Sequence, residues 1–214
     1  DLKNKFKDIF ILSPSQKFLR NFMSPQTPYK GLFIIHGTGV GKTCTAISIA
    51  ENLKQFVNEN LKKIYVIRPD EFKRQIFEYN LLSSDNIENQ CTGNSYMKPE
   101  YEKYVNLCKE GSKENCSHVE KLIKKDIKKY YEFTNSLSWA NKVQDILNKR
   151  AGKLTGKARD EKIKKEIQQM FNNTVLIIDE AHDLRSGSNI KEEKIVPPVL
   201  KLVLKYSRNL RLIL

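Results

Sequence analysis

The sequence of 214 residues predicts an α/β fold, in which a parallel β-sheet carries helices on both faces and is interrupted by a helical insertion. Three observations lead to this prediction. Short apolar runs alternate with segments of helical periodicity, which is typical of strand–helix units in a parallel sheet. A long stretch without such runs separates the second from the third. One strand-to-helix junction is rich in glycine and ends in Gly-Lys-Thr.

Four apolar runs predict the strands. The first, GLFIIH from Gly31, is too short for a helix and predicts a buried strand. After Lys42, apolar residues recur at spacings of three and four, as on one face of an amphipathic helix. KIYVIRP predicts the second strand, which ends at a proline. TVLIID and LRLIL predict the third and fourth, and VPPVLKLVLKY between them predicts a helix opened by its prolines.

The segment from Leu81 to Met170 shows no strand pattern. HVEKLIKKDIKKYY places apolar residues on one helical face and five lysines on the other, and RDEKIKKEIQQMF repeats this arrangement. The stretch RAGKLTGKAR between them predicts an exposed linker. We therefore divide the chain into an N-terminal segment, a first part of the α/β domain, a mainly helical basic insertion and a second part of the domain, at residues 1–30, 31–82, 83–172 and 173–214.

The net charge is +13, from 38 Lys and Arg against 25 Asp and Glu residues. Such a balance favours a polyanionic partner, most often nucleic acid. Residues 119–171 contribute 14 basic and 7 acidic residues, together with aromatic side chains that could stack on bases. The alternatives are a lysine content that follows from an AT-rich genome, lysine rows that are only solvated, and aromatic side chains that belong to the core.

The cysteines and the hydropathy of the sequence indicate the redox compartment and whether the chain crosses a membrane. Cys44, Cys91, Cys108 and Cys116 show no CxxC pairing, which predicts thiols in a reducing intracellular compartment. A zinc site with His118 is disfavoured, because the short paired spacings of structural zinc modules are missing. No stretch approaches the roughly 18 uninterrupted apolar residues of a membrane span, so no membrane partner is expected. Because the chain starts with Asp and stops on an apolar run, we expect a segment of a longer polypeptide.

The junction HGTGVGKT has the composition of a phosphate-binding loop. A strand, a glycine-rich turn and a helix in succession point backbone N–H groups and a helix dipole at one place. Lys42 can reach the β and γ phosphates, and the Thr43 hydroxyl can ligate Mg²⁺. His36 stands where the strict pattern has glycine, which need not disturb a cradle built from backbone amides. The alternative is an ordinary glycine-rich turn. The predicted nucleotide-binding residues are Gly37, Thr38, Gly39, Val40, Gly41, Lys42 and Thr43.

The run VLIIDEAH carries two acidic residues to the end of a strand. We expect this strand beside the first one, at the edge of the sheet where doubly wound folds bind ligands. Asp179 can hold Mg²⁺ through water, and Glu180 can orient or deprotonate the attacking water. With the glycine-rich loop, these carboxylates predict a nucleoside triphosphate site that uses Mg²⁺.

GTGVGKT and DEAH resemble motifs I and II of superfamily 2 helicases and translocases. The stretch from Ser13 to Thr43, with CTGNSY and DEAHDLR, is similar to the helicase-like NTPases of nucleocytoplasmic large DNA viruses. That group contains the poxvirus nucleoside triphosphate phosphohydrolase and the early transcription factor small subunit, and HGTGxGKT is common in it. The resemblance covers most of the chain and implies a P-loop NTPase fold, namely the first RecA-like domain.

The resemblance also implies roles for single residues. Gln16 occupies the place of the glutamine that recognises adenine, its alternative being an exposed helix residue. Arg68 and Pro69 correspond to a contact with the nucleic-acid backbone, the alternative for Arg68 being a solvated charge at a strand end. His182 would link the nucleotide state to nucleic acid, and Thr43 and Asp179 would hold Mg²⁺. The implied catalytic residues are Lys42, Asp179, Glu180 and His182.

The resemblance implies an ATP-dependent motor domain acting on DNA or RNA, in viral transcription or in unwinding. It implies viral RNA polymerase or transcription factors as further partners, and the virion or the viral factory in the host cytoplasm as the location. Two alternatives stay open: an ATP-switched transcription factor subunit that separates no strands, and a restriction or remodelling-type DNA translocase. Without the arginine of a second RecA-like domain, we expect residues 1–214 alone to hydrolyse ATP weakly.

Overall fold

The structure, a computed structural model, describes residues 11–35, 41–54, 61–68, 91–92, 96, 98–181 and 190–214. Five strands within these residues form one sheet in the order β1-β5-β4-β2-β3, and every neighbouring pair is parallel. The strands are β1 (Gly31–Leu32), β2 (Lys63–Arg68), β3 (Tyr131–Asn135), β4 (Thr174–Ile178) and β5 (Arg211–Ile213). The predicted parallel α/β sheet is confirmed.

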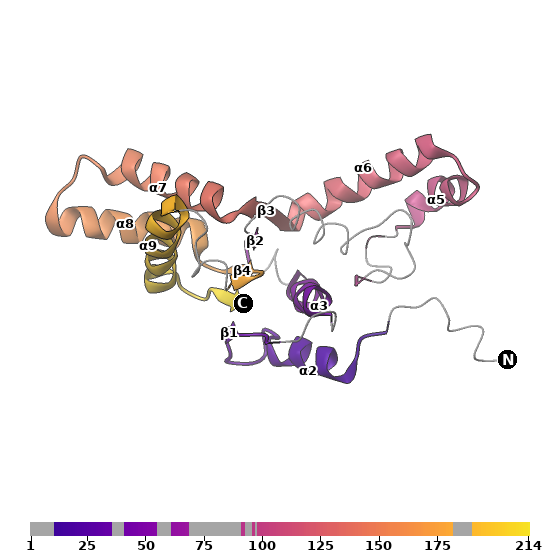
Figure 1. Ribbon diagram of the computed structural model, residues 1–214, viewed down its shortest axis with the longest axis horizontal. Coiled ribbons are helices and arrows are strands. Elements are labelled where there is room, and N and C mark those ends of the chain that lie inside the picture. Colours follow the sequence, from indigo (N-terminus) through magenta and orange to yellow (C-terminus); the bar gives the residue numbers. More distant parts are fainter. Residues whose placement is uncertain are drawn as a thin grey trace.

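Helices pack on both faces of this sheet (Figure 1). Ile64 and Val66 of β2 belong to a buried cluster with α3 and α6, whereas Ile67 belongs to a second cluster with α7, α8 and α9. This alternation follows from the two-residue period of a strand. The helices in the described part are α2 (Pro14–Phe22), α3 (Lys42–Lys54), α5 (Glu102–Lys109), α6 (Lys113–Tyr130), α7 (Ser136–Ala151), α8 (Gly156–Phe171) and α9 (Ile190–Tyr206), with a 3₁₀ turn η2 (Pro99–Tyr101).

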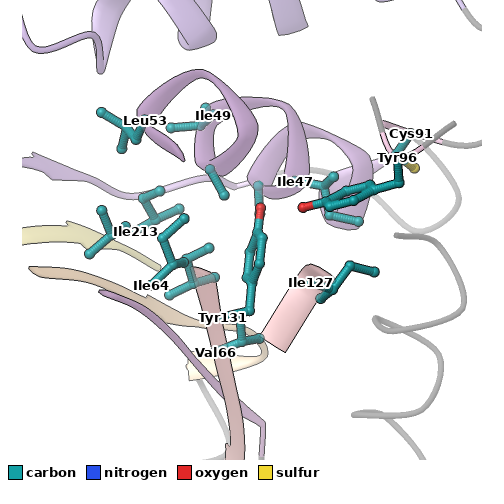
Figure 2. Close-up of a cluster of buried hydrophobic side chains, with 14 of the residues drawn as sticks. Ile47, Ile49, Leu53, Ile64, Val66, Cys91, Tyr96, Ile127, Tyr131 and Ile213 are labelled. Atoms are coloured by element: carbon teal, nitrogen blue, oxygen red, sulfur yellow. The ribbon is translucent and has the colours of Figure 1, made fainter. Parts of the chain in front are cut away.

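Aromatic residues join α3 to the sheet in the first of these clusters. Figure 2 shows the hydroxyl groups of Tyr131 and Tyr96 pointing toward the same part of α3. Both donate to Oε1 of Glu51 on that helix, over 2.6 and 2.9 Å, and Lys54 pairs with the other carboxylate oxygen. The carboxylate of Glu51, whose side chain is 11% exposed, is therefore bound by three donors, as a carboxylate largely shielded from water requires.

Strand β3 corrects the expectation that the segment from Leu81 to Met170 contains no strand. Its residues Tyr131–Asn135 pair in parallel with β2 and form an edge of the sheet. An edge strand has one neighbour only, and apart from Tyr131 its residues are half-buried. YEFTN therefore lacks the long apolar run of the central strands and lies unmarked between two long helices. The division of the chain into four parts stays a prediction.

Two further expectations about elements are wrong. GLFIIH was expected to be a buried strand, but β1 spans only Gly31–Leu32, and Phe33 and Ile35 are 64% and 78% exposed. β1 is the other edge of the sheet, so these side chains lack cover on one side. The helix expected to open at its prolines begins at Ile190 and contains Pro197 and Pro198 inside it. The preceding lysine and glutamate residues are good helix formers and extend it toward the N-terminus.

The cysteines are not free thiols in the described part of the chain, contrary to the prediction. Cys44 on α3 is bonded to Cys91, and Cys108 on α5 is bonded to Cys116 on α6. No group of three His, Cys, Asp or Glu residues that could hold a metal occurs among the described residues. Within the same residues, no helix is long and apolar enough to cross a membrane.

Reduction of the two disulfides is expected to lower the free energy of unfolding. The two cross-links close loops of 47 and 8 residues and so lower the entropy of the unfolded chain. In the chain-entropy model this stabilises the folded state by about 4 and about 2.5 kcal/mol. Urea unfolding with and without a phosphine reductant measures the difference. The paired variants C44S/C91S and C108S/C116S separate the two bonds. Equal midpoints under both conditions would contradict the bonded state.

A buried carboxylate on α6 gives the fold a dependence on pH. Asp126 accepts hydrogen bonds from Tyr101, Lys98 and Lys129 over 2.8, 2.6 and 2.7 Å. Burial by itself raises the pKa of Asp126, but the hydrogen bonds from Lys129, Lys98 and Tyr101 outweigh it and hold that pKa at about 2, below the ordinary 3.8. The carboxylate thus stabilises the fold fully above the unfolded pKa and stops doing so as the pH falls through the folded one.

We expect D126N to lose about 2 kcal/mol of unfolding free energy at pH 7. The loss should shrink as the pH approaches 2, because the wild-type carboxylate becomes protonated there. Denaturant titrations at pH 7, 4 and 2.5 measure it. The nearby Glu120 is a matched control, since its side chain is 36% exposed and its ion pair with Lys124 at 3.6 Å is solvated. A difference between wild type and D126N that is the same at every pH would contradict this account.

Candidate nucleotide-binding site

A cavity of about 280 Å³ lies at the carboxyl ends of β1, β4 and β5 and at the start of α3. Its wall is mostly apolar, with three ionisable side chains, and consists of Phe33, Ile34, Ile35, Lys42, Ala46, Ile177, Ile178, Asp179, Glu180, Ala181, Ile213 and Leu214. Lys42, Asp179 and Glu180 thus line one space, although Asp179 lies 137 positions after Lys42 in the sequence. A concave apolar pocket with few convergent polar groups is typical of a ligand site.

The sheet order corrects one detail of the expected geometry. The strand that carries Asp179 was expected beside the first strand, but β5 lies between β1 and β4. The cavity bridges this intervening strand, because Ile213 and Leu214 form part of its wall. Leu214 also fixes the residues after β1, since its carbonyl accepts from the N–H of Ile34 at 2.8 Å.

Gly41 and Lys42 form the junction at which α3 begins. Gly41 has φ +83°, in the left-handed region that glycine enters without steric cost. Its carbonyl accepts hydrogen bonds from the N–H and the hydroxyl of Thr45 at 2.9 and 3.1 Å, which ties the turn to the first turn of the helix. Lys42 and Thr43 follow as the first residues of α3. The other expected loop residues, His36, Gly37, Thr38, Gly39 and Val40, lie outside the described residues.

Gln16 lies against Gly41. It is 8% exposed, so the alternative of an exposed helix residue is wrong. Its side-chain oxygen accepts from the N–H of Ser13 at 2.9 Å, which closes the capping box at the start of α2. A Cβ added at Gly41 would lie 3.2 Å from Nε2 of Gln16. The glutamine amide is therefore packed at the edge of the candidate phosphate site, where a role in adenine recognition stays a prediction.

Asp179 and Glu180 follow directly on β4. The N–H of Asp179 donates to the carbonyl of Ile67 at 3.1 Å, which continues the pairing with β2 and fixes the backbone at this point. Glu180 has φ +57°. A glutamate rarely enters the left-handed region, and such strain is concentrated at functional positions in proteins. The tight turn places both residues on the wall of the cavity.

Arg68 forms an ion pair with Asp179 through Nη2 and Oδ2. The two side chains are 4% and 11% exposed, so the alternative of a solvated charge at a strand end is wrong. The sequence pattern predicts a contact of Arg68 with the nucleic-acid backbone and gives no sign of this pair. Arg68 and Asp179 each follow an apolar run that forms a strand. Knowledge that these two strands, β2 and β4, are neighbours in the sheet would have predicted the ion pair. Pro69 and His182 lie outside the described residues.

The donor set at this cavity fits a magnesium-bound triphosphate. Mg²⁺ prefers oxygen ligands and keeps several waters, so it needs one or two protein groups beside the phosphates. Asp179 supplies a carboxylate that already holds a cation, the guanidinium of Arg68. Thr43 does not itself line the cavity, but it follows Lys42 on α3 and carries a hydroxyl. The ammonium of Lys42 and the N-terminus of α3 suit the negative phosphates.

Comparisons with known proteins place the chain in a family. The family model described as "Type III restriction enzyme, res subunit" matches residues 9–212. "Putative ATP-dependent RNA helicase L377" of Acanthamoeba polyphaga mimivirus is 30% identical over 221 residues, covering 98% of this chain and 18% of that protein. No solved structure matches.

Two further relatives come from large DNA viruses. "Putative ATP-dependent RNA helicase R563" of the same mimivirus is 31% identical over 180 residues, covering 84% of this chain and 26% of that protein. "Putative helicase 087L" of Invertebrate iridescent virus 3 is 28% identical over 198 residues, covering 87% and 16%. The chain thus spans about a quarter or less of the length of these relatives. Since the family model covers nearly the whole chain, the protein belongs to the type III restriction enzyme res-subunit family of helicase-type NTPases, with relatives in large DNA viruses.

Proposed function

We propose that this chain is the ATP-binding and ATP-hydrolysing motor domain of a superfamily 2 helicase or translocase that acts on nucleic acid. The observation that carries the proposal is the meeting of Lys42, Asp179 and Glu180 at one cavity. An ammonium and two carboxylates around an apolar pocket are the charges that phosphoryl transfer requires, since catalysis there is mostly positioning and electrostatic stabilisation. The family membership agrees with this role.

Each group has a distinct task in the proposed reaction. Lys42 holds the β and γ phosphates as a point charge, and the backbone N–H groups of residues 37–41 are proposed as further phosphate contacts. Thr43 and Asp179 would hold Mg²⁺, which would supply positive charge to offset that of the phosphates. Glu180 orients or deprotonates the attacking water. Gln16 recognises adenine, and His182 links the nucleotide state to nucleic acid.

The proposed nucleic-acid partner is supported by the net charge of +13 and by the lysine face of α6. Lys121, Lys124, Lys125 and Lys128 are exposed, while Val119, Ile123 and Ile127 on the opposite face are buried. A row of exposed ammonium groups can neutralise backbone phosphates and release counterions. Arg68 and Pro69 are the further proposed contacts, at the end of β2.

Reversing three of these charges is expected to flatten the salt dependence of binding. K121E, K125E and K128E together should reduce the slope of log affinity against log salt by up to about 3 if all three contact phosphates of duplex DNA. Fluorescence anisotropy with labelled DNA and RNA from 50 to 300 mM salt measures the slope. K194E, K201E and K205E on α9 are the matched control, because these lysines are also exposed. Equal slopes of log affinity against log salt in the two triple variants would show that α6 does not contact the nucleic acid.

The family description favours one alternative, a restriction-type DNA translocase, because it names a restriction enzyme subunit. The other is an ATP-switched transcription factor subunit, supported by the resemblance of CTGNSY and DEAHDLR to viral transcription proteins. On the same resemblance we propose viral RNA polymerase or transcription factors as partners. It also supports a location in the virion or in viral factories of the host cytoplasm.

The test uses the complete protein from which the chain comes. ATPase activity is measured with and without DNA and RNA, and strand displacement is measured on tailed duplexes. Stimulation by nucleic acid with displacement supports a helicase. Stimulation without displacement supports the translocase or the switch. Absence of ATP hydrolysis under all conditions, in wild type as in K42A, would refute the proposed function.

A further inference from the structure

Arg68 and Asp179 face each other across two neighbouring strands. Ile67 of β2 is paired with Ile178 of β4, and the N–H of Asp179 donates to the carbonyl of Ile67 at 3.1 Å. Arg68 and Asp179 are the next residues along the two strands, so their side chains leave the sheet at the same edge. Each main chain is held by the sheet, and the ion pair therefore forms between two fixed positions.

Because the ion pair between Arg68 and Asp179 is buried, breaking it costs free energy. The side chains of Arg68 and Asp179 are 4% and 11% exposed. A buried carboxylate that loses its cation is destabilised far more than a solvated one, because water cannot replace the lost partner. Only another cation can take its place without that cost.

The proposed function brings such a cation to the same carboxylate. Asp179 lines the cavity beside Lys42, and it is the proposed ligand of Mg²⁺. A hydrated dication and a guanidinium repel each other because both are positive, and the carboxylate of Asp179 that pairs with Arg68 is the one that would also hold the metal. Metal and arginine therefore compete for Asp179.

We propose that Arg68 is the internal counter-ion of Asp179 in the nucleotide-free protein, and that the magnesium–nucleotide complex displaces it. The inference rests on the proposed function and adds a regulatory element to that site. Arg68 raises the concentration of Mg²⁺ that nucleotide binding requires. Displacement frees the guanidinium at the end of β2, where Pro69 follows and where contact with the nucleic-acid backbone is proposed. Binding of nucleotide at Asp179, after β4, thereby changes the position of Arg68 at the end of β2, because one cation replaces another on the same carboxylate.

The test is the Mg²⁺ dependence of nucleotide binding by the complete protein. A fluorescent, non-hydrolysable ATP analogue is titrated at a series of free Mg²⁺ concentrations, with wild type and R68Q. We expect the half-saturating Mg²⁺ concentration to fall about tenfold in R68Q, because the metal no longer competes with a buried cation. The double variant R68Q/D179N should need the same Mg²⁺ concentration as the single variant D179N, because the carboxylate for which both cations compete is gone in both.

Thermal unfolding without nucleotide gives a second readout. R68Q should unfold at a lower temperature than wild type in EDTA, and Mg²⁺ alone should restore more of its stability than it adds to wild type. R68K, which keeps a charge but loses the planar fork, should shift both measurements in the same direction and less far. It serves as the test variant if R68Q does not fold.

The two proposals fail in different ways. If wild type binds no nucleotide at any Mg²⁺ concentration, the proposed function is wrong. If wild type binds the magnesium–nucleotide complex, but R68Q and R68K need as much Mg²⁺ as wild type and gain no extra stability from it, the proposed function stands. In that case Arg68 has only a structural role and the counter-ion inference is overturned.

Discussion

E180Q in the complete protein is expected to lower the rate of ATP hydrolysis by about 100- to 10,000-fold, which is the usual contribution of a positioned general base. Nucleotide binding should persist, because Lys42 and Asp179 remain at the cavity. Glutamine has the shape of glutamate and keeps the hydrogen-bonding oxygen, but it cannot accept a proton from water. Steady-state ATPase assays and fluorescent-nucleotide binding separate the two effects.

The backbone at Glu180 supplies a control for this prediction. Its φ of +57° favours glycine, so E180G should relieve backbone strain and still lose the hydrolytic rate. E161Q is the matched control for the change of charge, since the Glu161 side chain is 75% exposed on α8. Turnover by E180Q within a few-fold of wild type would show that another group activates the water.

Y131A is expected to lower the free energy of unfolding by about 3–5 kcal/mol, the usual cost of removing a buried aromatic side chain. Tyr131 is 1% exposed at the start of β3, and its ring is stacked with that of Phe133 at 5.7 Å. For a domain of this size the melting temperature should fall by roughly 2–4 °C per kcal/mol. Urea unfolding and calorimetry measure both quantities.

Y131F separates the ring from its hydroxyl. Burial raises the pKa of Tyr131, so the hydroxyl remains a donor to Glu51 at 2.6 Å. Removing it should cost only about 1 kcal/mol, because Tyr96 and Lys54 still satisfy the carboxylate. If Y131F destabilises as much as Y131A, the hydrogen bonds to Glu51 and not the filled core hold α3 against β3.

The strands that the sequence revealed are those that the fold buries on both faces. β4 is buried at all five positions and β2 at four of six, so apolar runs mark them. The edge strands obey another rule. β3 has one fully buried residue, and β1 leaves Phe33 exposed just beyond its end. Their residues depend on a single neighbour that only the tertiary structure provides, and periodicity along the chain does not report it.

The candidate site was predictable where local chemistry defines it. Lys42 follows a glycine-rich turn and Asp179 ends an apolar run, and each pattern indicates its role without the other. The partner of Asp179 was not predictable in this way, because its identity depends on strand order. Similarly, the bond between Cys44 and Cys91 joins residues 47 apart along the chain, and no spacing rule connects them.

The most direct test of the account is a crystal structure of the complete protein with Mg²⁺ and a non-hydrolysable ATP analogue. We expect the triphosphate in the cavity at the carboxyl ends of β1, β4 and β5, with its terminal phosphates on Lys42 and the metal between those phosphates and Asp179. A nucleotide bound elsewhere, or a triphosphate that contacts neither residue, would contradict the central claim that these two distant segments form one nucleotide site.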